Sequence, residues 1–305
     1  MQISLPKYRL KDFLNNRWFY LLLLPGLTYF FIFRYIPMWG LRIAFMDYNM
    51  FNPSESTFIG MENFMRLFSR NTFVPVLWNT IRISLLRLFA GFPIPIILAL
   101  MMNEMRSLMY KRTIQTVLYL PHFISWVIMA GLMINLFDPS GGVIAGIIRF
   151  FTGETPMVLT NRRMFVPMLV ASGIYKEMGW GTIIYFAAIS GIDSEQYEAA
   201  TIDGASRLTQ VFRITIPSIM PTIIILFILN CGGILNAGFE QVFMLYSPPV
   251  YEVADIIDTF VYRMGIIRND YAFSTAAGFF KSVVAFILIV SVNQLARLTD
   301  NQGIF

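Results

Sequence analysis

The sequence predicts an all-α, polytopic membrane protein with six membrane-spanning helices. Of its 305 residues, 56% are hydrophobic and only 13% are charged, and the mean hydropathy is +0.62. A single soluble core cannot enclose that much apolar surface. The apolar residues also gather in six stretches near the length of about 20 that a helix needs to cross a bilayer. They lack the alternating pattern of a barrel strand, so we expect helices, which pair their own backbone groups.

The six predicted spans follow one another through polar connections, and no repeat, low-complexity stretch or linker divides them. We therefore expect residues 1–305 to form one membrane domain. Kinks are predicted at four prolines, namely Pro25, Pro93, Pro95 and Pro121. The predicted spans are Trp18–Phe45, Val76–Met102, Thr116–Phe137, Met164–Ile189, Ile219–Phe243 and Phe273–Leu295.

Basic residues before the first span predict the orientation of the bundle, and they are Lys7, Arg9, Lys11 and Arg17. The apolar run that follows them is too long for the core of a cleavable signal. The positive-inside rule places this end in the cytoplasm, and six spans return the carboxyl terminus to the same side, although Arg162 and Arg163 run against the rule. The cytoplasmic connections are then Asn103–Ile114 and Gly191–Leu208, and the outer ones are Asp47–Pro75, Asp138–Arg163 and Met244–Ala272.

Composition and motifs exclude several functions. The net charge of +5 reflects topology and lipid contact, because no basic run with interleaved aromatics lies outside the spans, and a nucleic-acid partner is not expected. Cys231 is the only cysteine, so no disulfide within the chain and no metal site of several thiolates can form. A phosphate-binding G-x-x-x-x-G-K-[ST] loop is absent. We therefore expect no catalytic residues, no metal and no nucleotide site in this chain.

The polar stretch 191–217, between the fourth and fifth spans, predicts a short cytoplasmic helix. Ser194 is a suitable N-cap, and Glu195 lies in the first turn, where the helix dipole favours an acid. Gly204 either admits another backbone or turns the chain, and Pro217 opens the next span where its missing N–H costs little. An apolar face is predicted from the spacing of Tyr197, Ala200, Ala205, Leu208 and Phe212. The alternative is an amphipathic helix lying on the lipid headgroups.

The same stretch resembles the EAA loop of ATP-binding-cassette (ABC) importer permeases. That pattern is Glu-Ala-Ala, three residues, Gly, nine residues, then Ile-x-Leu-Pro, and the only departure here is Ile216 in place of Leu. The resemblance implies that this helix is the coupling helix, which docks in a cleft of a nucleotide-binding subunit with Glu198 as its polar contact. The residues it assigns to coupling are Glu198, Ala199, Ala200, Gly204, Ala205, Ile216 and Pro217.

Residues 10–300 as a whole are similar to the carbohydrate-uptake branch of type I ABC permeases, in particular to the subgroup that serves oligosaccharides and polysaccharide fragments. The similar segments are LWNTIRISLLRLFAGFPIPIILALMMNEMR, YLPHFISWVI, GWGTIIYFAAISGID and FEQVFMLYSPPVYEVADIIDTFVYR. The resemblance implies a bacterial cytoplasmic membrane protein that works with a second homologous permease and an extracytoplasmic solute-binding protein. It also implies two partner ATPase subunits, which hold the ATP and Mg²⁺.

Other functions remain open at this stage. An ABC permease could instead carry an amino acid or phosphate. A membrane-embedded glycosyl-lipid enzyme would need an acidic cluster near a membrane face, for which Asp193, Glu195, Glu198 and Asp203 are the candidates. A channel or receptor is a third class, although neither requires an EAA loop.

Polar and aromatic residues inside the fourth and fifth spans are candidates for the substrate path. Sugars stack on aromatic faces and exchange hydrogen bonds with amides and carboxylates. Asn236 and Glu240 lie four residues apart and would share a helix face, whereas Asn230 joins them only if Gly232 and Gly233 distort the helix. The alternative is that these amides tie helices together and the aromatics form interfacial belts. The candidates are Tyr175, Trp180, Asn230, Asn236, Phe239, Glu240 and Gln241.

Charged residues within the spans are also candidates, because charge at membrane depth is costly. We expect Arg87, in the outer half of the second span, to pair with a carboxylate in a structural role. His122, the only histidine, is expected to pack between helices. Lys281 in the sixth span is expected either to pair with Glu177 or to face a cavity.

Overall fold

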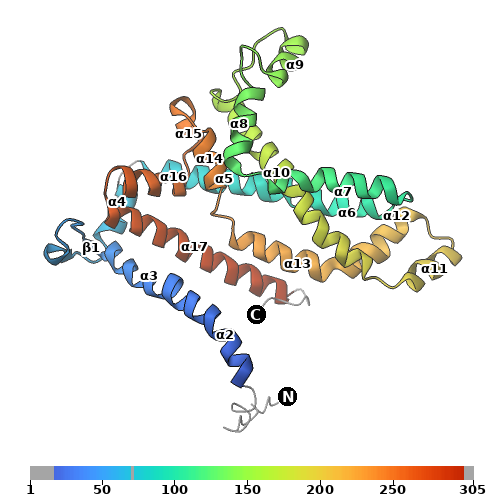
Figure 1. The fold of residues 1–305 in the computed structure, drawn as a ribbon, viewed down its shortest axis with the longest axis horizontal. Coiled ribbons are helices and arrows are strands. Elements are labelled where there is room, and N and C mark those ends of the chain that lie inside the picture. Colours follow the sequence, from blue (N-terminus) through green and yellow to red (C-terminus); the bar gives the residue numbers. More distant parts are fainter. Residues whose placement is uncertain (1–16, 70–71, 299–305) are drawn as a thin grey trace.

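The computed structural model describes residues 17–69 and 72–298, and Figure 1 shows a helical protein through almost all of that length. The expected all-α class is confirmed, with the small addition of a two-stranded hairpin. Lys7, Arg9 and Lys11, from which the orientation was predicted, lie outside the described residues.

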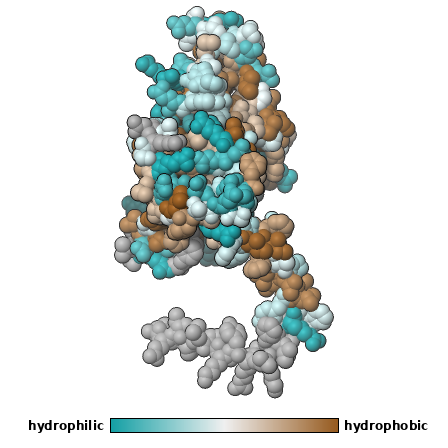
Figure 2. Space-filling model, turned by 90° about the vertical axis from the view of Figure 1, so that its left-hand side faces the viewer, coloured by the Kyte–Doolittle hydropathy of each residue, from teal (hydrophilic) through white to brown (hydrophobic). Residues whose placement is uncertain are grey.

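The first helical stretch, Arg17–Phe45, projects away from the bundle at its start (Figure 1), whereas its last part packs against the long C-terminal helix. It comprises α2 (Arg17–Phe30), η1 (Phe31–Tyr35), α3 (Ile36–Met38) and η2 (Trp39–Phe45). Its most apolar window has no buried residue, and Figure 2 shows it as a largely hydrophobic arm. Lipid or another protein chain must therefore cover it.

A small subdomain with a two-stranded hairpin follows this arm. Strands β1 (Met46–Asp47) and β2 (Thr57–Phe58) pair antiparallel, with η3 (Pro53–Glu55) between them. Helix α4 (Glu62–Ser69) is tied to the end of the arm by Asn63, whose amide donates to the carbonyl oxygens of Ala44 and Met46 at 3.1 and 3.0 Å.

Three long helical elements form the body of the bundle. The second span is a 31-residue stretch of α5 (Phe73–Gly91) and α6 (Pro93–Asn103). Helix α10 (Arg162–Ser190) packs against both of them and against α7, and α17 (Tyr271–Leu298) packs beside α13.

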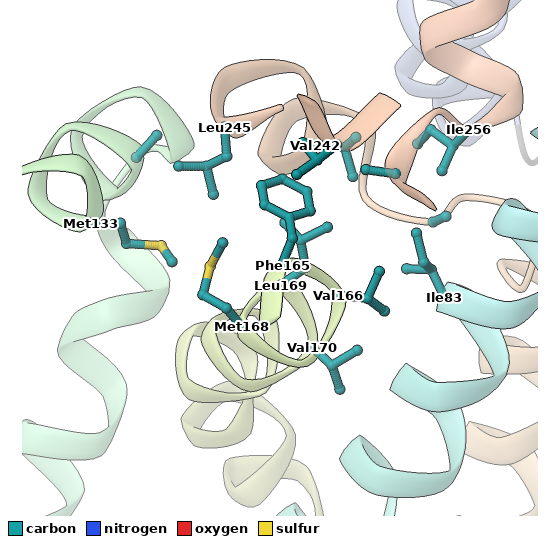
Figure 3. Close-up of a cluster of buried hydrophobic side chains, with 14 of the residues drawn as sticks. Ile83, Met133, Phe165, Val166, Met168, Leu169, Val170, Val242, Leu245 and Ile256 are labelled. Atoms are coloured by element: carbon teal, nitrogen blue, oxygen red, sulfur yellow. The ribbon is translucent and has the colours of Figure 1, made fainter. Parts of the chain in front are cut away.

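One apolar core joins α5, α8, α10 and the segments that precede α17 (Figure 3). Phe165 and Leu169 of α10 lie at its centre and are fully buried. Ile83 of α5, Val242 of α14 and Ile256 surround them, so this core fixes α14 against the two long helices.

The third predicted span is not one continuous helix. It is divided into α7 (Leu108–Phe123) and α8 (Trp126–Leu136), which meet at 102°. Ser125 begins α8 as its N-cap by accepting a hydrogen bond from the backbone N–H of Ile128 at 3.4 Å. Lys176 of α10 donates to the carbonyl oxygen of His122 at 2.7 Å, and so serves one of the groups that the break releases. Helix α9 (Val143–Thr152) follows.

The predicted bounds of the fifth span, Ile219–Phe243, are wrong at both ends. The helical stretch begins at Arg207 and runs through α12 (Arg207–Gln210), η4 (Val211–Thr215) and α13 (Ile216–Gly232). It ends at Gly232, and the chain is not helical again until α14 (Phe239–Leu245). Gly238, the N-cap of α14, has a φ of 81°, which is costly for any residue except glycine.

Short elements form the remaining outer connection before α17. They are η5 (Pro248–Val250), α15 (Tyr251–Ala254), α16 (Ile257–Tyr262) and η6 (Arg263–Ile267). Asp255 lies just before α16 and is paired with Arg263, with a shortest oxygen–nitrogen distance of 2.5 Å.

Among the described residues, four helical stretches are long and apolar enough to cross a membrane, and the bent pair α7–α8 would make a fifth. The four are Arg17–Phe45, Phe73–Asn103, Arg207–Gly232 and Tyr271–Leu295. Helix α10 has the length but, with polar residues such as Lys176 and Glu177 along it, is not among them.

The close contact between α7 and α10 depends on Gly179, because a methyl group there would overlap the carbonyl oxygen of Leu118. We predict that Gly179→Ala lowers the thermal unfolding temperature of the purified protein, since overpacking costs about 1–3 kcal/mol. Gly131→Ala is the matched control, because nothing lies within 4 Å of the added carbon. Equal unfolding temperatures for the two variants would contradict this packing.

Candidate functional site

A cavity of about 580 Å³ lies where the two interrupted spans meet the long helices. Its walls come from α5, α6, α10 and α13, and from the non-helical segment between α13 and α14. Trp126, the first residue of α8, completes the lining. The volume falls in the range of about 300–1,000 Å³ that is typical of small-molecule sites.

Three of the predicted substrate-path residues line this cavity: Trp180 from α10, Asn230 near the end of α13, and Asn236 from the segment before α14. The indole and the two amides therefore come from three different elements that line one cavity. They offer a stacking surface and hydrogen-bonding groups within one cavity.

The other four predicted residues lie elsewhere. Tyr175 is exposed on α10, and Glu240 is exposed at the start of α14; neither lines this cavity or the second one. Phe239 lines the second cavity. Gln241 is fully buried behind the wall, where its amide donates to the carbonyl oxygen of Leu169 at 3.0 Å and to the Ser172 hydroxyl at 2.7 Å.

The predicted pairing of Asn236 with Glu240 on one helix face is wrong, because the chain leaves the helix between Asn230 and Asn236. The helix ends at Gly232, and the next residues turn so that Asn230 and Asn236 line the same cavity. Glu240 belongs to a different helix, is exposed, and is not part of the cavity lining. The prediction that Asn230 joins Asn236 only if Gly232 and Gly233 distort the helix agrees with this ending, whereas the span predicted to continue to Phe243 does not.

One face of the Trp180 ring is already covered. His122 stacks on it with ring centroids 4.8 Å apart and an interplanar angle of 9°. The Nδ1 atom of His122 lies 3.0 Å from an oxygen of Glu177, which also lines the cavity. His122 therefore packs between α7 and α10, and it orients both a carboxylate and an indole of the site.

Arg87 lies on the cavity wall. The prediction that it pairs with a carboxylate is wrong. Its Nη2 donates to the amide oxygen of Gln241, and none of the ion pairs among the described residues includes it. Gly238 lies so close that a methyl group there would overlap the guanidinium. Arg87 thus joins α5 to the start of α14 through a neutral partner.

A second, more open cavity of about 530 Å³ lies beyond Asn236, which lines both. Phe239 and Tyr262 contribute aromatic rings to it. Lys281 of α17 also lines it and pairs with Asp258, with nitrogen–oxygen distances of 2.6 and 2.8 Å. The alternative of a Lys281–Glu177 pair is therefore wrong.

The predicted cytoplasmic helix is α11 (Ser194–Ile202), and its N-cap is Asp193 instead of Ser194. The Asp193 carboxylate accepts a hydrogen bond from the N–H of Glu195 at 3.0 Å. Gly204 turns the chain with a φ of 77°. The N–H of Ala205 donates to the carbonyl of Ala200 and that of Gly204 to Thr201, so the helix ends in a Schellman motif.

The predicted coupling residues lie along this turn and the helix that follows it. Glu198 and Ala199 are exposed, whereas Ala200 and Ala205 are half-buried. Ile216 and Pro217 are the first two residues of α13, where the π-helical turn η4 precedes them. Pro217 is thus inside a helical run and does not open it, and the wider turn accommodates its missing N–H.

Large apolar side chains are exposed beside this turn. Ile202 is 86% exposed, and Leu208 and Phe212 are 71% and 67% exposed. Arg207, at the start of α12, pairs with Glu104 after α6 at 2.8 Å. The turn is therefore anchored to the bundle, and its large apolar side chains are left exposed.

Sequence reasoning missed Ser84, Trp126 and the cavity position of Glu177. The place of Trp126 depends on the 102° bend between α7 and α8, which the predicted kink at Pro121 did not by itself specify. Pro121 and Ser125 are the two residues that could have indicated it, as a helix-breaking residue followed by an N-cap.

A bundle of long apolar helices around a partly polar cavity is the architecture of a membrane permease. The family model described as "Binding-protein-dependent transport system inner membrane component" matches residues 91–301, and the chain belongs to this family.

Its relatives include two proteins of Bacillus subtilis (strain 168). Protein LplB is 47% identical over 292 residues, which cover 95% of this chain and 92% of the relative. The polygalacturonan/rhamnogalacturonan transport system permease protein YteP is 43% identical over 293 residues, which cover 96% and 91%.

Solved structures agree with this relationship. A bacterial ABC transporter involved in import of the acidic polysaccharide alginate matches with a TM-score of 0.88 and 41% identity, over 94% of this chain and 97% of that chain. The alginate transporter in complex with an alginate pentasaccharide-bound periplasmic protein matches with a TM-score of 0.89, over 97% and 100%.

Proposed function

We propose that this chain is one of two membrane permease subunits of an ATP-driven importer for oligosaccharides, in the cytoplasmic membrane of a bacterium. The cavity that brings Trp180, Asn230 and Asn236 together carries the proposal. An indole provides an apolar face for a sugar ring, and amides exchange hydrogen bonds with its hydroxyl groups. The relatives named for alginate and polygalacturonan support the substrate class.

The proposed topology has six spans in one domain, residues 1–305, with both termini in the cytoplasm. The bent pair α7–α8 is the third span, and α10, whose polar residues face the cavity and α7, is the fourth. A helix with polar groups on the protein side can cross a membrane without exposing them to lipid.

Coupling to ATP hydrolysis is assigned to the loop 191–217. Its exposed acid Glu198 and the exposed apolar groups Ile202, Leu208 and Phe212 form a surface for a partner protein. In this proposal two ATPase subunits hold the ATP and Mg²⁺, and one of them receives α11. A second permease and an extracytoplasmic binding protein complete the importer.

The helical run Arg207–Gly232 suggests how the loop reaches the cavity. It starts directly after the turn at Gly204 and ends two residues beyond Asn230. Movement of α11 by the ATPase would therefore tilt a helix whose far end is a cavity wall. This provides a mechanical route to alternating access.

Reconstitution tests the proposed function. We expect proteoliposomes with both permeases, the ATPase pair and the binding protein to take up oligosaccharides from a panel of acidic and neutral oligomers only when ATP is enclosed. The readout is labelled sugar retained in the vesicles, and vesicles lacking this chain are the control. ATP-independent uptake, or no uptake of any oligosaccharide, would contradict the proposal.

Gly204 provides a sharper test of the coupling assignment. Nothing lies within 4 Å of a carbon added at Gly204, so a larger side chain would meet no neighbouring atom. A substitution would therefore act only by straining the backbone, whose φ is 77°. Left-handed geometry costs roughly 1–2 kcal/mol for an ordinary residue and less for asparagine. We expect Gly204→Val to abolish uptake and sugar-stimulated ATP hydrolysis, and Gly204→Asn to retain both. Equal activities would refute a coupling role for this turn.

A further inference from the structure

Two polar atoms on the α5 wall of the main cavity lack hydrogen-bond partners. They are the hydroxyl oxygen of Ser84 and the Nε of Arg87, and both are sealed from solvent. The two residues are three positions apart, so they lie on the same face of the helix. Buried polar atoms almost always have partners, so an unpaired pair on one cavity wall requires an explanation.

The Arg87 guanidinium is held in position but is not neutralised. Its one hydrogen bond to the described residues goes from Nη2 to Gln241, and Gln241 is itself fixed by Leu169 and Ser172. Nη1 lies against Gly238, has no partner and is not among the sealed atoms. The group therefore keeps free donors beside the cavity that it lines.

The acidic group of the same cavity is already engaged. An oxygen of Glu177 lies 3.0 Å from Nδ1 of His122, and its other oxygen lies 4.0 Å from Nζ of Lys176. No ion pair joins Glu177 to Arg87 among the described residues. Among the described residues, Arg87 is thus a cation within a spanning stretch that forms no ion pair, and such residues are typical of sites for charged ligands.

We propose that Arg87, together with Ser84, binds the carboxylate of a uronic acid unit, so that the imported oligosaccharide is acidic. This inference rests on the proposed function and goes further by assigning the charge of the sugar. A guanidinium presents parallel N–H donors that match the two oxygens of a carboxylate. The Ser84 hydroxyl supplies another donor from the same wall.

The rest of the cavity accommodates the remainder of such a sugar. Asn230 and Asn236 line it from the α13 side and can bond to ring hydroxyls, and the Trp180 indole, which also lines it, offers an apolar group for a sugar ring. Relatives named for alginate and polygalacturonan fit the same charge.

Equilibrium dialysis of the purified importer complex, without the binding protein, tests this site. The probes are tetramers of galacturonate and of mannuronate, each compared with its carboxyl-reduced, neutral form. We expect the wild-type complex to prefer one of the acidic tetramers by about tenfold or more, because hydrogen bonds to charged groups contribute more than neutral ones. Arg87→Gln should remove the preference, and Arg87→Lys should keep part of it.

Arg82→Gln is the matched control, because Arg82 is on the same helix but exposed and not in the cavity lining. It should keep the full preference. An unchanged preference in Arg87→Gln overturns the proposal; if that variant fails to assemble, an unchanged preference in Arg87→Lys does so. A wild-type complex that binds and imports only neutral oligomers also overturns it but leaves the proposed function intact, whereas the absence of any oligosaccharide import would contradict the proposed function itself.

Discussion

The need to pair backbone groups inside a membrane governs where this chain can interrupt its helices. Both interruptions lie at the cavity. At the first, Ile124–Ser125, the Lys176 ammonium donates to the carbonyl oxygen of His122, and the Ser125 hydroxyl accepts from the N–H of Ile128. The second follows Gly232, where the segment from Gly233 lines the cavity together with α5 and α10, and Ile289 of α17 lies against Gly232. The breaks place Trp126 and Asn236 in the lining, so the same feature that threatens stability also creates the polar walls of the site.

One helical run, Arg207–Gly232, connects the turn at Gly204 with the cavity. The Arg207–Glu104 pair anchors the start of this run to the end of α6. Arg87 lies on the opposite wall and holds the start of α14 through Gln241. A tilt of α13 would therefore change the distance between Asn230 on one wall and Arg87 on the other, and in the proposed mechanism this change releases the sugar.

Local signals in the sequence predicted much of this arrangement. Apolar length located the first, second, fourth and sixth long helices to within a few residues, and Gly204 was recognised as a possible turn. Contacts between distant residues were not predictable. Arg87 and Gln241 are 154 positions apart, and only the folded chain shows that its partner is an amide and not a carboxylate. Asn236 and Glu240 were misjudged for a related reason, because Gly232 ends a helix that periodicity alone would continue.

The accessibility of position 236 tests most directly whether this cavity is the sugar path. The single cysteine, Cys231, is replaced by serine, and a cysteine is introduced at Asn236 or, as the control, at Leu229, which is exposed and lines neither cavity. The account predicts that a charged, membrane-impermeant thiol reagent modifies Asn236→Cys in the assembled importer and that bound oligosaccharide protects it, while Leu229→Cys is unreactive. Equal reactivity at the two positions, or no protection by any oligosaccharide, would contradict it.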